Sequence, residues 1–375
     1  MQRLFYKLNK MDTIQDFRTE YFPNAEDKDW NNWHWQIQNR IADADKTAEV
    51  FALTPETKEA FADGVKIPFA VTPYYAAACK GTPLEKTILP SPKENITNKL
   101  EVADPLGEEP CFAAPNLVHR YNDRALFLVT NFCPSYCRYC TRGRRAGRED
   151  MTVNDWEPAL KYIATHPEIR DVLISGGEPL ILSDEKLDAL LSRLRAIPRV
   201  EIIRIGTKVP VSLPMRITPE LIQILKKHNP VFLSVHINRA EEITAEVSKA
   251  FNDLADNGIL LGSQTVLLNG VNDDADTLLT LMHKLLKNRV KPYYLFQCDP
   301  IAGSGHFRVP LRKGIAIMDE LRRRTSGYAI PTYAIDIPNR FGKIAVLPNH
   351  IQECANGVVK ILNFDGNVYE YPDAE

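Results

Sequence analysis

The sequence predicts an α/β protein built around a parallel β-sheet. Short apolar runs typical of buried strands recur six times from about residue 125, with helical patterns between them. This alternation favours parallel strands joined by right-handed helical crossovers. It leaves two architectures open, a doubly wound sheet and a barrel of fewer than eight strands. The runs are 125–129, 171–174, 201–205, 231–235, 260–267 and 292–296, and the helical patterns lie near 154–166, 184–196, 219–228, 241–256, 274–287 and 312–323.

The composition is that of an ordinary globular protein, with 375 residues, 44% hydrophobic and 25% charged. The formal net charge of −2 gives no electrostatic reason to expect a nucleic-acid or membrane partner. No apolar run approaches the ~20 residues that a membrane span needs. The N-terminus lacks the pattern of a secretory signal, and the seven cysteines are unevenly spaced, unlike a disulfide framework. We therefore expect a cytoplasmic protein.

Residues 1–115 are predicted to form a helical and irregular N-terminal region. Apolar residues at Trp30, Trp33, Ile37 and Ile41 follow a helical period and predict one amphipathic helix that packs on the main domain. Several prolines between residues 66 and 110 predict a connection without long helices. The α/β part is expected over 116–340, and a C-terminal segment over 341–375. In that segment the Asp-Gly pair at 365–366 lies between two short alternating runs and predicts a β-hairpin.

Three cysteines directly after the first strand-like run carry the clearest chemistry. Cys133, Cys137 and Cys140 are spaced C-x₃-C-x₂-C. A four-iron cluster ordinarily takes four thiolates, so three leave one iron open to another ligand, as in a reactive metal centre. The alternatives are a zinc site completed by a distant histidine, or ordinary core thiols. Zinc sites usually show two paired spacings, and no second pair exists here.

The stretch from Cys133 to Arg142, CPSYCRYCTR, resembles the radical S-adenosylmethionine (SAM) superfamily and, within it, the lysine 2,3-aminomutase family. The resemblance covers roughly residues 29–371. It implies a partial (β/α)₆ barrel with the cluster loop after the first strand, and a [4Fe-4S] cluster whose fourth iron is chelated by SAM. It also implies a small amino-acid substrate, an external electron donor of the flavodoxin or ferredoxin type, and a homodimer or larger homo-oligomer.

SAM-binding residues are expected at the carboxyl ends of the strands, where α/β folds place their sites. The second strand-like run is followed by a Ser-Gly-Gly-Glu-Pro segment that matches the motif contacting the SAM amino group in radical SAM enzymes. Its glycines allow the backbone to approach a ligand closely. Lys208 and Asn238 are strand-end candidates that equally fit ordinary polar rim residues. The predicted SAM-binding residues are Ser175, Gly176, Gly177, Glu178, His236 and Gln264.

The resemblance implies a second cofactor, pyridoxal 5′-phosphate (PLP). Lys343 occupies the place of the lysine that forms the Schiff base with PLP. Arg120, Tyr121 and Arg124 match the family's H-R-Y-x-D-R stretch, which holds PLP, and arginine suits a phosphate through its fork of donors. The glycine run that precedes the lysine in the family is replaced here by Asn339-Arg340-Phe341-Gly342. This departure predicts a stiffer loop and leaves open whether Arg340 meets a phosphate or faces solvent.

The charges predict the substrate. Arg142, beside the cluster, is the natural partner of an amino-acid carboxylate. Asp299 and Asp336 match the aspartates that hold the ε-ammonium of lysine in the family, and two carboxylates in one site call for a cation. The resemblance therefore implies an isomerase, a radical SAM and PLP-dependent aminomutase that interconverts L-lysine and L-β-lysine by 2,3-migration of the amino group.

Three alternatives stay open at this point. The substrate could be another amino acid, arginine before glutamate, because two aspartates also suit a guanidinium. The same reaction could serve β-lysylation of a translation factor. The chain could also bind a cluster without PLP, as another radical SAM enzyme or as a redox sensor. No zinc is predicted, because Asp274 follows the V-N-D segment where zinc-binding relatives carry a cysteine, and the sequence lacks their cysteine-rich extension.

Overall fold

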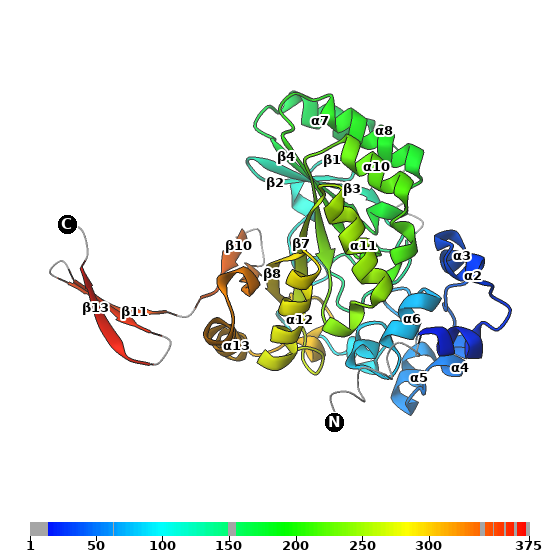
Figure 1. Cartoon of the computed structure of the whole chain (residues 1–375), viewed down its shortest axis with the longest axis horizontal. Coiled ribbons are helices and arrows are strands. Elements are labelled where there is room, and N and C mark those ends of the chain that lie inside the picture. Colours follow the sequence, from blue (N-terminus) through cyan, green and yellow to red (C-terminus); the bar gives the residue numbers. More distant parts are fainter. Residues whose placement is uncertain are drawn as a thin grey trace.

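A ten-stranded sheet, with its strands in chain order from β1 to β10, forms the centre of the computed structural model (Figure 1). The structure describes residues 14–62, 64–148, 155–337, 342–347, 349–355, 358–363 and 366–372. Strands β3 to β9 run parallel, whereas β1 and β2 at one edge and β10 at the other pair antiparallel. The strands are β1 Phe112–Ala114, β2 Leu117–Tyr121, β3 Arg124–Thr130, β4 Asp171–Gly176, β5 Ile202–Thr207, β6 Val231–His236, β7 Leu260–Leu267, β8 Lys291–Gln297, β9 Thr332–Ile337 and β10 Gly342–Ala345.

The sheet is rolled into a partial barrel. Strands β2 and β10 stand near opposite ends of the strand order, yet the backbone N–H of Lys343 on β10 donates to the hydroxyl of Tyr121 on β2 over 3.1 Å. Side chains from β2, β3, β4, β5, β7, β8, β9 and β10 line one cavity. Strands so far apart in the order enclose one space only if the sheet curves round it. The predicted partial barrel is thereby confirmed over the open doubly wound sheet.

All six predicted strands are present, and β9 adds a seventh parallel strand. The sequence pattern did not predict β9, because only part of this strand is apolar and buried: Tyr333 and Ala334 are buried, whereas Asp336 faces a cavity. The antiparallel strand β2 was not predicted for the same reason, since Arg120 and Tyr121 at its end also line that cavity. Cavity-lining strands lose the continuous apolar signal of a buried parallel strand.

The helices between the strands follow the predicted pattern. In α8, Ser183 caps the N-terminus by accepting from the backbone N–H of Lys186, and leucines at 187, 190, 191 and 194 recur at helical spacing and are fully buried. Burial of each leucine contributes about 1.5–3 kcal/mol. In Figure 1, α7, α8, α10 and α11 lie together along one side of the sheet. The helices are α7 Glu157–Thr165, α8 Asp184–Arg195, α9 Val209–Ser212, α10 Pro219–Lys227, α11 Ala245–Asp256, α12 Ala275–Lys287 and α13 Leu311–Arg324.

The N-terminal region consists of short helices, and the prediction of one helix through Trp30 and Ile41 is wrong. Asn31 is the C-cap that ends one helix, and the side chain of Asn32 accepts from the backbone N–H groups of His34 and Trp35 and so begins the next. Packing on the barrel is confirmed, because the guanidinium of Arg216 lies 4.9 Å from the centre of the Trp33 ring. The helices are α2 Asp27–Trp30, α3 Trp33–Gln38, α4 Ala44–Val50, α5 Pro55–Ala62 and α6 Pro73–Cys79. The predicted connection of residues 66–110 contains α6, which is only seven residues long, and the 3₁₀ turns η1 Pro83–Thr87, η2 Pro92–Asn95 and the start of η3 Glu109–Cys111, so the expectation of no long helix there is confirmed.

A small antiparallel sheet of β11 (Ile351–Ala355), β12 (Val358–Leu362) and β13 (Val368–Pro372) lies apart from the barrel (Figure 1). The predicted pairing of the last two strands is confirmed, with Val359 opposite Tyr371. Asp365 of the predicted turn lies outside the described residues, and Gly366 has a φ of +82°. In the described part of the chain, no helix combines the length and hydropathy needed to cross a membrane.

Candidate active site

Two adjoining cavities occupy the barrel. The cluster cavity, about 280 Å³, contains Cys133, Cys137 and Cys140 in its wall. The arginine cavity, about 570 Å³, contains Arg120 and Arg124. Every residue predicted to bind cluster, cofactor or substrate lines one of these cavities or both. The residues shared by both walls are Leu106, Arg142, Leu173, Gln264, Phe296, Asp336 and Lys343.

The three cysteines lie on the loop that follows β3. Burial, followed by the neighbouring Cys137, raises the pKa of Cys140 to about 11, so this thiol stays protonated until a metal binds. In the part of the chain that the structure describes, no group of three or more His, Cys, Asp and Glu side chains is arranged to hold one metal ion. A four-iron cluster takes its thiolates on separate irons, so this finding for a single ion does not test the predicted cluster site.

The cluster loop is held by the N-terminal region. Buried Arg138 forms an ion pair with Glu94, and its Nη1 donates to the carbonyl of Ile67 over 2.8 Å. Arg40 donates from Nη1 to the carbonyl of Cys133 over 3.0 Å, and its guanidinium lies 4.4 Å from the ring centre of Phe132. Each contact joins the loop to a chain segment more than 40 residues earlier. The N-terminal region thus forms part of the cluster site.

The two glycines after β4 bring that strand against the cluster loop. The backbone N–H of Gly177 donates to the carbonyl of Thr130 over 2.6 Å, and that of Glu178 donates to Phe132 over 2.8 Å. A Cβ on Gly177 would lie 2.3 Å from the carbonyl oxygen of Phe132. Gly176, with a φ of +127°, would bring a Cβ within 2.1 Å of the Thr130 carbonyl. These glycines are needed for backbone contact with the loop, whatever ligand they also meet.

The carboxylate of Glu178 is hydrogen-bonded to other groups of the protein. Its carboxylate accepts from the hydroxyl of Thr207 over 2.6 Å and from the backbone N–H of Lys208 over 2.7 Å. Burial raises the pKa of Glu178 to about 7, against the opposing effect of these hydrogen bonds. Glu178 thus ties the end of β4 to the end of β5, and its predicted contact with SAM remains a prediction.

The other strand-end candidates divide into two groups. His236 and Gln264 line the cluster cavity at neighbouring positions of β6 and β7. Burial, and then the cations of Lys208 and Arg142, lower the pKa of His236 to about 4, so its imidazole is neutral. Lys208 also lines the cavity, but its Nζ lies 3.0 Å from the buried carboxylate of Glu242. Asn238 donates to the hydroxyl of Tyr139 over 2.6 Å, so it contacts the cluster loop and helps to hold it in place.

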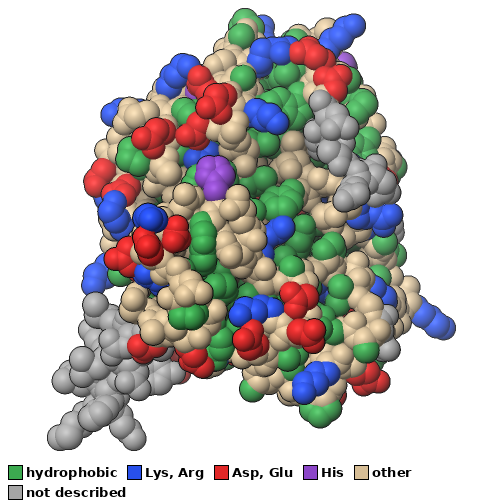
Figure 2. All heavy atoms as spheres, turned by 90° about the vertical axis from the view of Figure 1, so that its right-hand side faces the viewer, with side chains coloured by type: hydrophobic (Ala, Val, Ile, Leu, Met, Phe, Trp, Pro, Cys, Tyr) green, Lys and Arg blue, Asp and Glu red, His purple; other side chains and the backbone are tan. Residues whose placement is uncertain are grey.

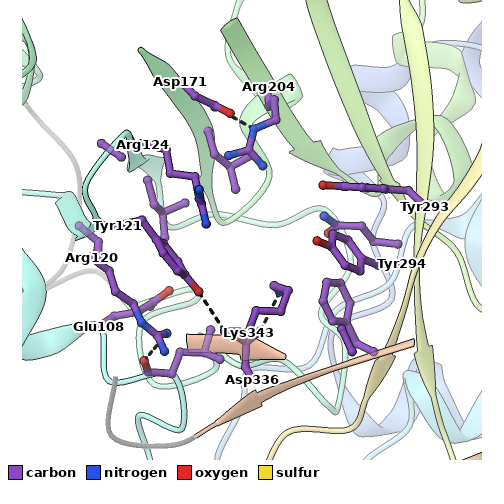
Figure 3. A pocket seen from close by; sticks show the side chains of 18 of the residues that line it. Glu108, Arg120, Tyr121, Arg124, Asp171, Arg204, Tyr293, Tyr294, Asp336 and Lys343 are labelled. Atoms are coloured by element: carbon purple, nitrogen blue, oxygen red, sulfur yellow. Dashed lines mark hydrogen bonds and ion pairs between the residues drawn. The ribbon is translucent and has the colours of Figure 1, made fainter. Parts of the chain in front are cut away.

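The arginine cavity has the donors of an anion site (Figure 3). Nη1 of Arg120 donates to the carbonyl of Leu106 over 2.9 Å, whereas its buried Nε and Nη2 have no partner among the described residues. The guanidinium of Arg124 lies 3.9 Å from the ring centre of Tyr121. A buried donor without a partner costs about 1–3 kcal/mol, and an anion would remove that cost. The three residues predicted from the H-R-Y-x-D-R stretch therefore fit a phosphate group.

Lys343 lies at the boundary between the cavities. It follows the first residue of β10, and its Nζ lies 2.8 Å from Asp336 and 4.0 Å from the ring centre of Phe296. Its amine therefore borders both cavities. Arg340 and the other residues of the altered loop, 338–341, lie outside the described residues.

Asp299 and Asp336 come together on the cluster side. Burial, and then the negative charge of Asp336, raise the pKa of Asp299 to about 7, against the opposing cations of Lys343 and Arg308. Like charges confined in one site disfavour ionisation of both. A bound cation would relieve this, as predicted from the sequence.

Arg142 makes a contact that the sequence did not indicate. Its Nε lies 3.0 and 3.1 Å from the two carboxylate oxygens of Glu108, and its Nη2 lies 2.7 Å from Oε1. Nη1 lies 3.4 Å from Oγ of Ser175. Burial disfavours the charge on Arg142, but Glu108 outweighs burial and raises the pKa of Arg142.

Sequence reasoning missed Glu108 and the pair of Arg204 with Asp171. Glu108 lies in the proline-containing connection, where no strand end marked it. Arg204 donates from Nε to Asp171 over 2.8 Å inside the arginine cavity (Figure 3). A signal for Arg204 existed, because a charge within the apolar strand Ile202–Thr207 needs a polar surrounding.

Known proteins and family profiles match most of this chain. The sequence profile of the Radical SAM superfamily matches residues 127–282, and that of Lysine-2,3-aminomutase matches residues 318–375. The chain is 42% identical to L-lysine 2,3-aminomutase of Fusobacterium nucleatum, over 97% of this chain and 87% of the relative. It is 44% identical to L-lysine 2,3-aminomutase of Clostridium subterminale, over 95% and 87%.

A relative with a different substrate also matches. Glutamate 2,3-aminomutase of Clostridioides difficile is 39% identical over 93% of this chain and 84% of its own length. Membership of the family therefore leaves the substrate to be argued from the site. On these matches, the chain belongs to the lysine 2,3-aminomutase family of radical SAM enzymes.

Proposed function

We propose that this protein interconverts L-lysine and L-β-lysine by 2,3-migration of the amino group. The observation that carries the proposal is the placement of Lys343 between two cavities, one suited to a phosphate and the other containing three thiols. When bound, the cluster and SAM supply a carbon radical that takes a hydrogen atom from the substrate, and PLP carries the migrating nitrogen. The protein's own residues then bind, orient and enclose the reactants.

Each group has residues of suitable chemistry. Cys133, Cys137 and Cys140 would ligate the cluster, and the cavity wall from Ser175 to Glu178 with His236 and Gln264 would hold SAM. Lys343 would anchor PLP, with its phosphate at Arg120, Tyr121 and Arg124. Apolar Leu106, Leu173 and Phe296 line both cavities and would exclude water where the reactants meet.

The substrate class is inferred from charge. Arg142 provides the cation for an α-carboxylate, and Asp299 with Asp336 provides two carboxylates for an ammonium. A glutamate side chain would bring a third negative charge to that pair, whereas lysine neutralises it. Arginine remains the second candidate, since a guanidinium also suits two carboxylates.

The electron donor, the oligomeric state and the location of the enzyme are also part of the proposal. We infer an external electron donor of the flavodoxin or ferredoxin type, a homodimer or larger homo-oligomer, and a cytoplasmic location. On the face shown in Figure 2, basic and acidic side chains are interspersed, which favours small substrates over a polyanionic partner there. The division into residues 1–115, 116–340 and 341–375 is likewise a proposal, although β10 of the last segment closes the barrel's cavity wall.

Substitution of Lys343 tests the cofactor assignment. Purified Lys343→Ala should lose the visible absorbance of protein-bound PLP because the amine that anchors it is gone. Iron and sulfide content should remain as in the unchanged enzyme, since Lys343 belongs to β10 and not to the cluster loop. An unchanged enzyme that carries iron but binds no PLP would contradict the proposed function.

A further inference from the structure

Glu108 occupies one edge of the Arg142 guanidinium. Its carboxylate spans Nε and Nη2, with distances of 2.7–3.1 Å. A planar guanidinium has five N–H donors, so this side-on contact uses one hydrogen on Nε and one on Nη2. The second hydrogen of Nη2 and those of Nη1 remain on the outer edge. Arg142 can therefore bind two carboxylates at once, one on each edge.

The contact with Glu108 fixes the direction in which the outer edge of the Arg142 guanidinium faces. Arg142 lines both cavities, and its Nη1 lies 3.4 Å from Oγ of Ser175, which lines the cluster cavity. The side chain of Arg142 has several freely rotating bonds, whose ordering costs up to about 2 kcal/mol. Glu108, with its side chain only 4% exposed, holds the guanidinium in one orientation before any substrate arrives.

Glu108 is itself fixed by the segment around it, residues 104–109, which we call the strap. Arg144 lies 3.1 Å from Asp104 and 3.0 Å from Glu109, at the two ends of the strap, and 3.4 Å from Glu108 itself. The carbonyl of Leu106 accepts from Nη1 of Arg120 over 2.9 Å, and the Leu106 side chain lines both cavities. The strap thus connects the arginine of the phosphate site with the arginine of the substrate site.

We propose that Glu108 is a positioning residue for recognition of the substrate α-carboxylate: it aims the outer edge of Arg142 at that carboxylate through the side-on contact. The inference rests on the proposed function and extends it to a residue on the strap. It predicts that Glu108 contributes to binding only when the ligand carries a carboxylate.

The experiment compares L-lysine with L-lysinamide, which retains both amino groups and lacks the carboxylate. Each is titrated into PLP-loaded enzyme without SAM, and the shift in PLP absorbance on displacement of Lys343 reports binding without turnover. In the unchanged enzyme, lysine should bind more tightly than lysinamide. In Glu108→Ala this preference should fall about tenfold, because the outer edge of Arg142 is no longer held toward the ligand carboxylate and that charge-assisted contact weakens, while lysinamide affinity stays the same. Glu108→Gln retains one acceptor and should be intermediate.

Two controls separate positioning from general damage. Glu109→Ala removes the neighbouring carboxylate, which is half-exposed and pairs with Arg144, and it should leave the preference for lysine intact. Iron and PLP content of each variant is measured beside the titrations. If Glu108→Ala loses its cofactors, Glu108→Gln provides the comparison.

The outcomes distinguish the two claims. A lysine preference retained in full by a PLP-loaded Glu108 variant would overturn the role of Glu108 and leave the proposed function standing. An equal loss of affinity for lysine and lysinamide would also overturn it, because that pattern indicates a merely structural role. An unchanged enzyme whose PLP absorbance responds to neither ligand would contradict the proposed function itself.

Discussion

At the scale of single residues, the site contains two ion pairs that differ in burial. Lys343 pairs with Asp336 at 2.8 Å in a partly exposed place, whereas Glu108 pairs with Arg142 at 2.7 Å and its side chain is only 4% exposed. Removing one partner of a buried pair such as Glu108 and Arg142 costs about 3–5 kcal/mol, because the remaining charge is uncompensated. A substrate with an ammonium at one end and a carboxylate at the other replaces or extends these pairs. This is a physical reason for expecting a dibasic amino acid.

The titration of Asp299 makes this expectation measurable. With a pKa raised to about 7 by burial and by Asp336, Asp299 is protonated below that pH and then offers no charge to an ammonium. The affinity for lysine should therefore fall as the pH decreases below about 7, by up to about tenfold for each pH unit.

The measurement is the pH dependence of kcat/KM for lysine, with cofactor content checked at each pH. A profile that stays flat from about pH 8 down to pH 5.5 would refute the assigned role of Asp299.

At the scale of elements, the end of β4 is hydrogen-bonded to the backbone at the start of the cluster loop, and we expect this contact to support cluster binding. In Gly177→Ala the new Cβ would lie 2.3 Å from a backbone carbonyl oxygen, so the loop must move. We expect a loss of about 1–3 kcal/mol in the free energy of unfolding and a lower iron content per chain. Gly206→Ala at the end of β5 is the matched control, because its nearest heavy atom would be 3.6 Å away.

Iron analysis and thermal unfolding check this prediction. Normal iron content and unchanged thermal stability in Gly177→Ala would show that the close approach is unimportant.

The strands and helices differ in how far the sequence alone could predict them. The six parallel strands and their helices were predictable because buried strands are continuously apolar and covering helices show a 3.6-residue period. Strands β2 and β9 were not, because they turn polar residues toward the cavities. The cysteine spacing indicated the cluster loop directly. Glu108 was out of reach, since its effect depends on a fold that brings the strap against residue 142, which is 34 positions later.

At the scale of the whole molecule, three separate parts of the chain complete one site. The N-terminal region holds the cluster loop through Arg138 and Arg40, the barrel carries the cavity walls, and β10 supplies Lys343. The contact of Lys343 with Tyr121 joins the two ends of the sheet. The site therefore forms only when the barrel is complete, which explains why the motifs and the family resemblance could imply the cofactors, whereas the mutual placement of the residues required the fold.

The central claim is that this geometry selects lysine for 2,3-amino migration. The most direct test is an anaerobic assay of reconstituted enzyme with dithionite, SAM and PLP, with lysine, arginine and glutamate offered in parallel. We predict β-lysine as the product, with no β-glutamate. β-Arginine or β-glutamate in place of β-lysine would contradict the substrate assignment, and SAM cleavage without any β-amino acid would contradict the assignment as an aminomutase.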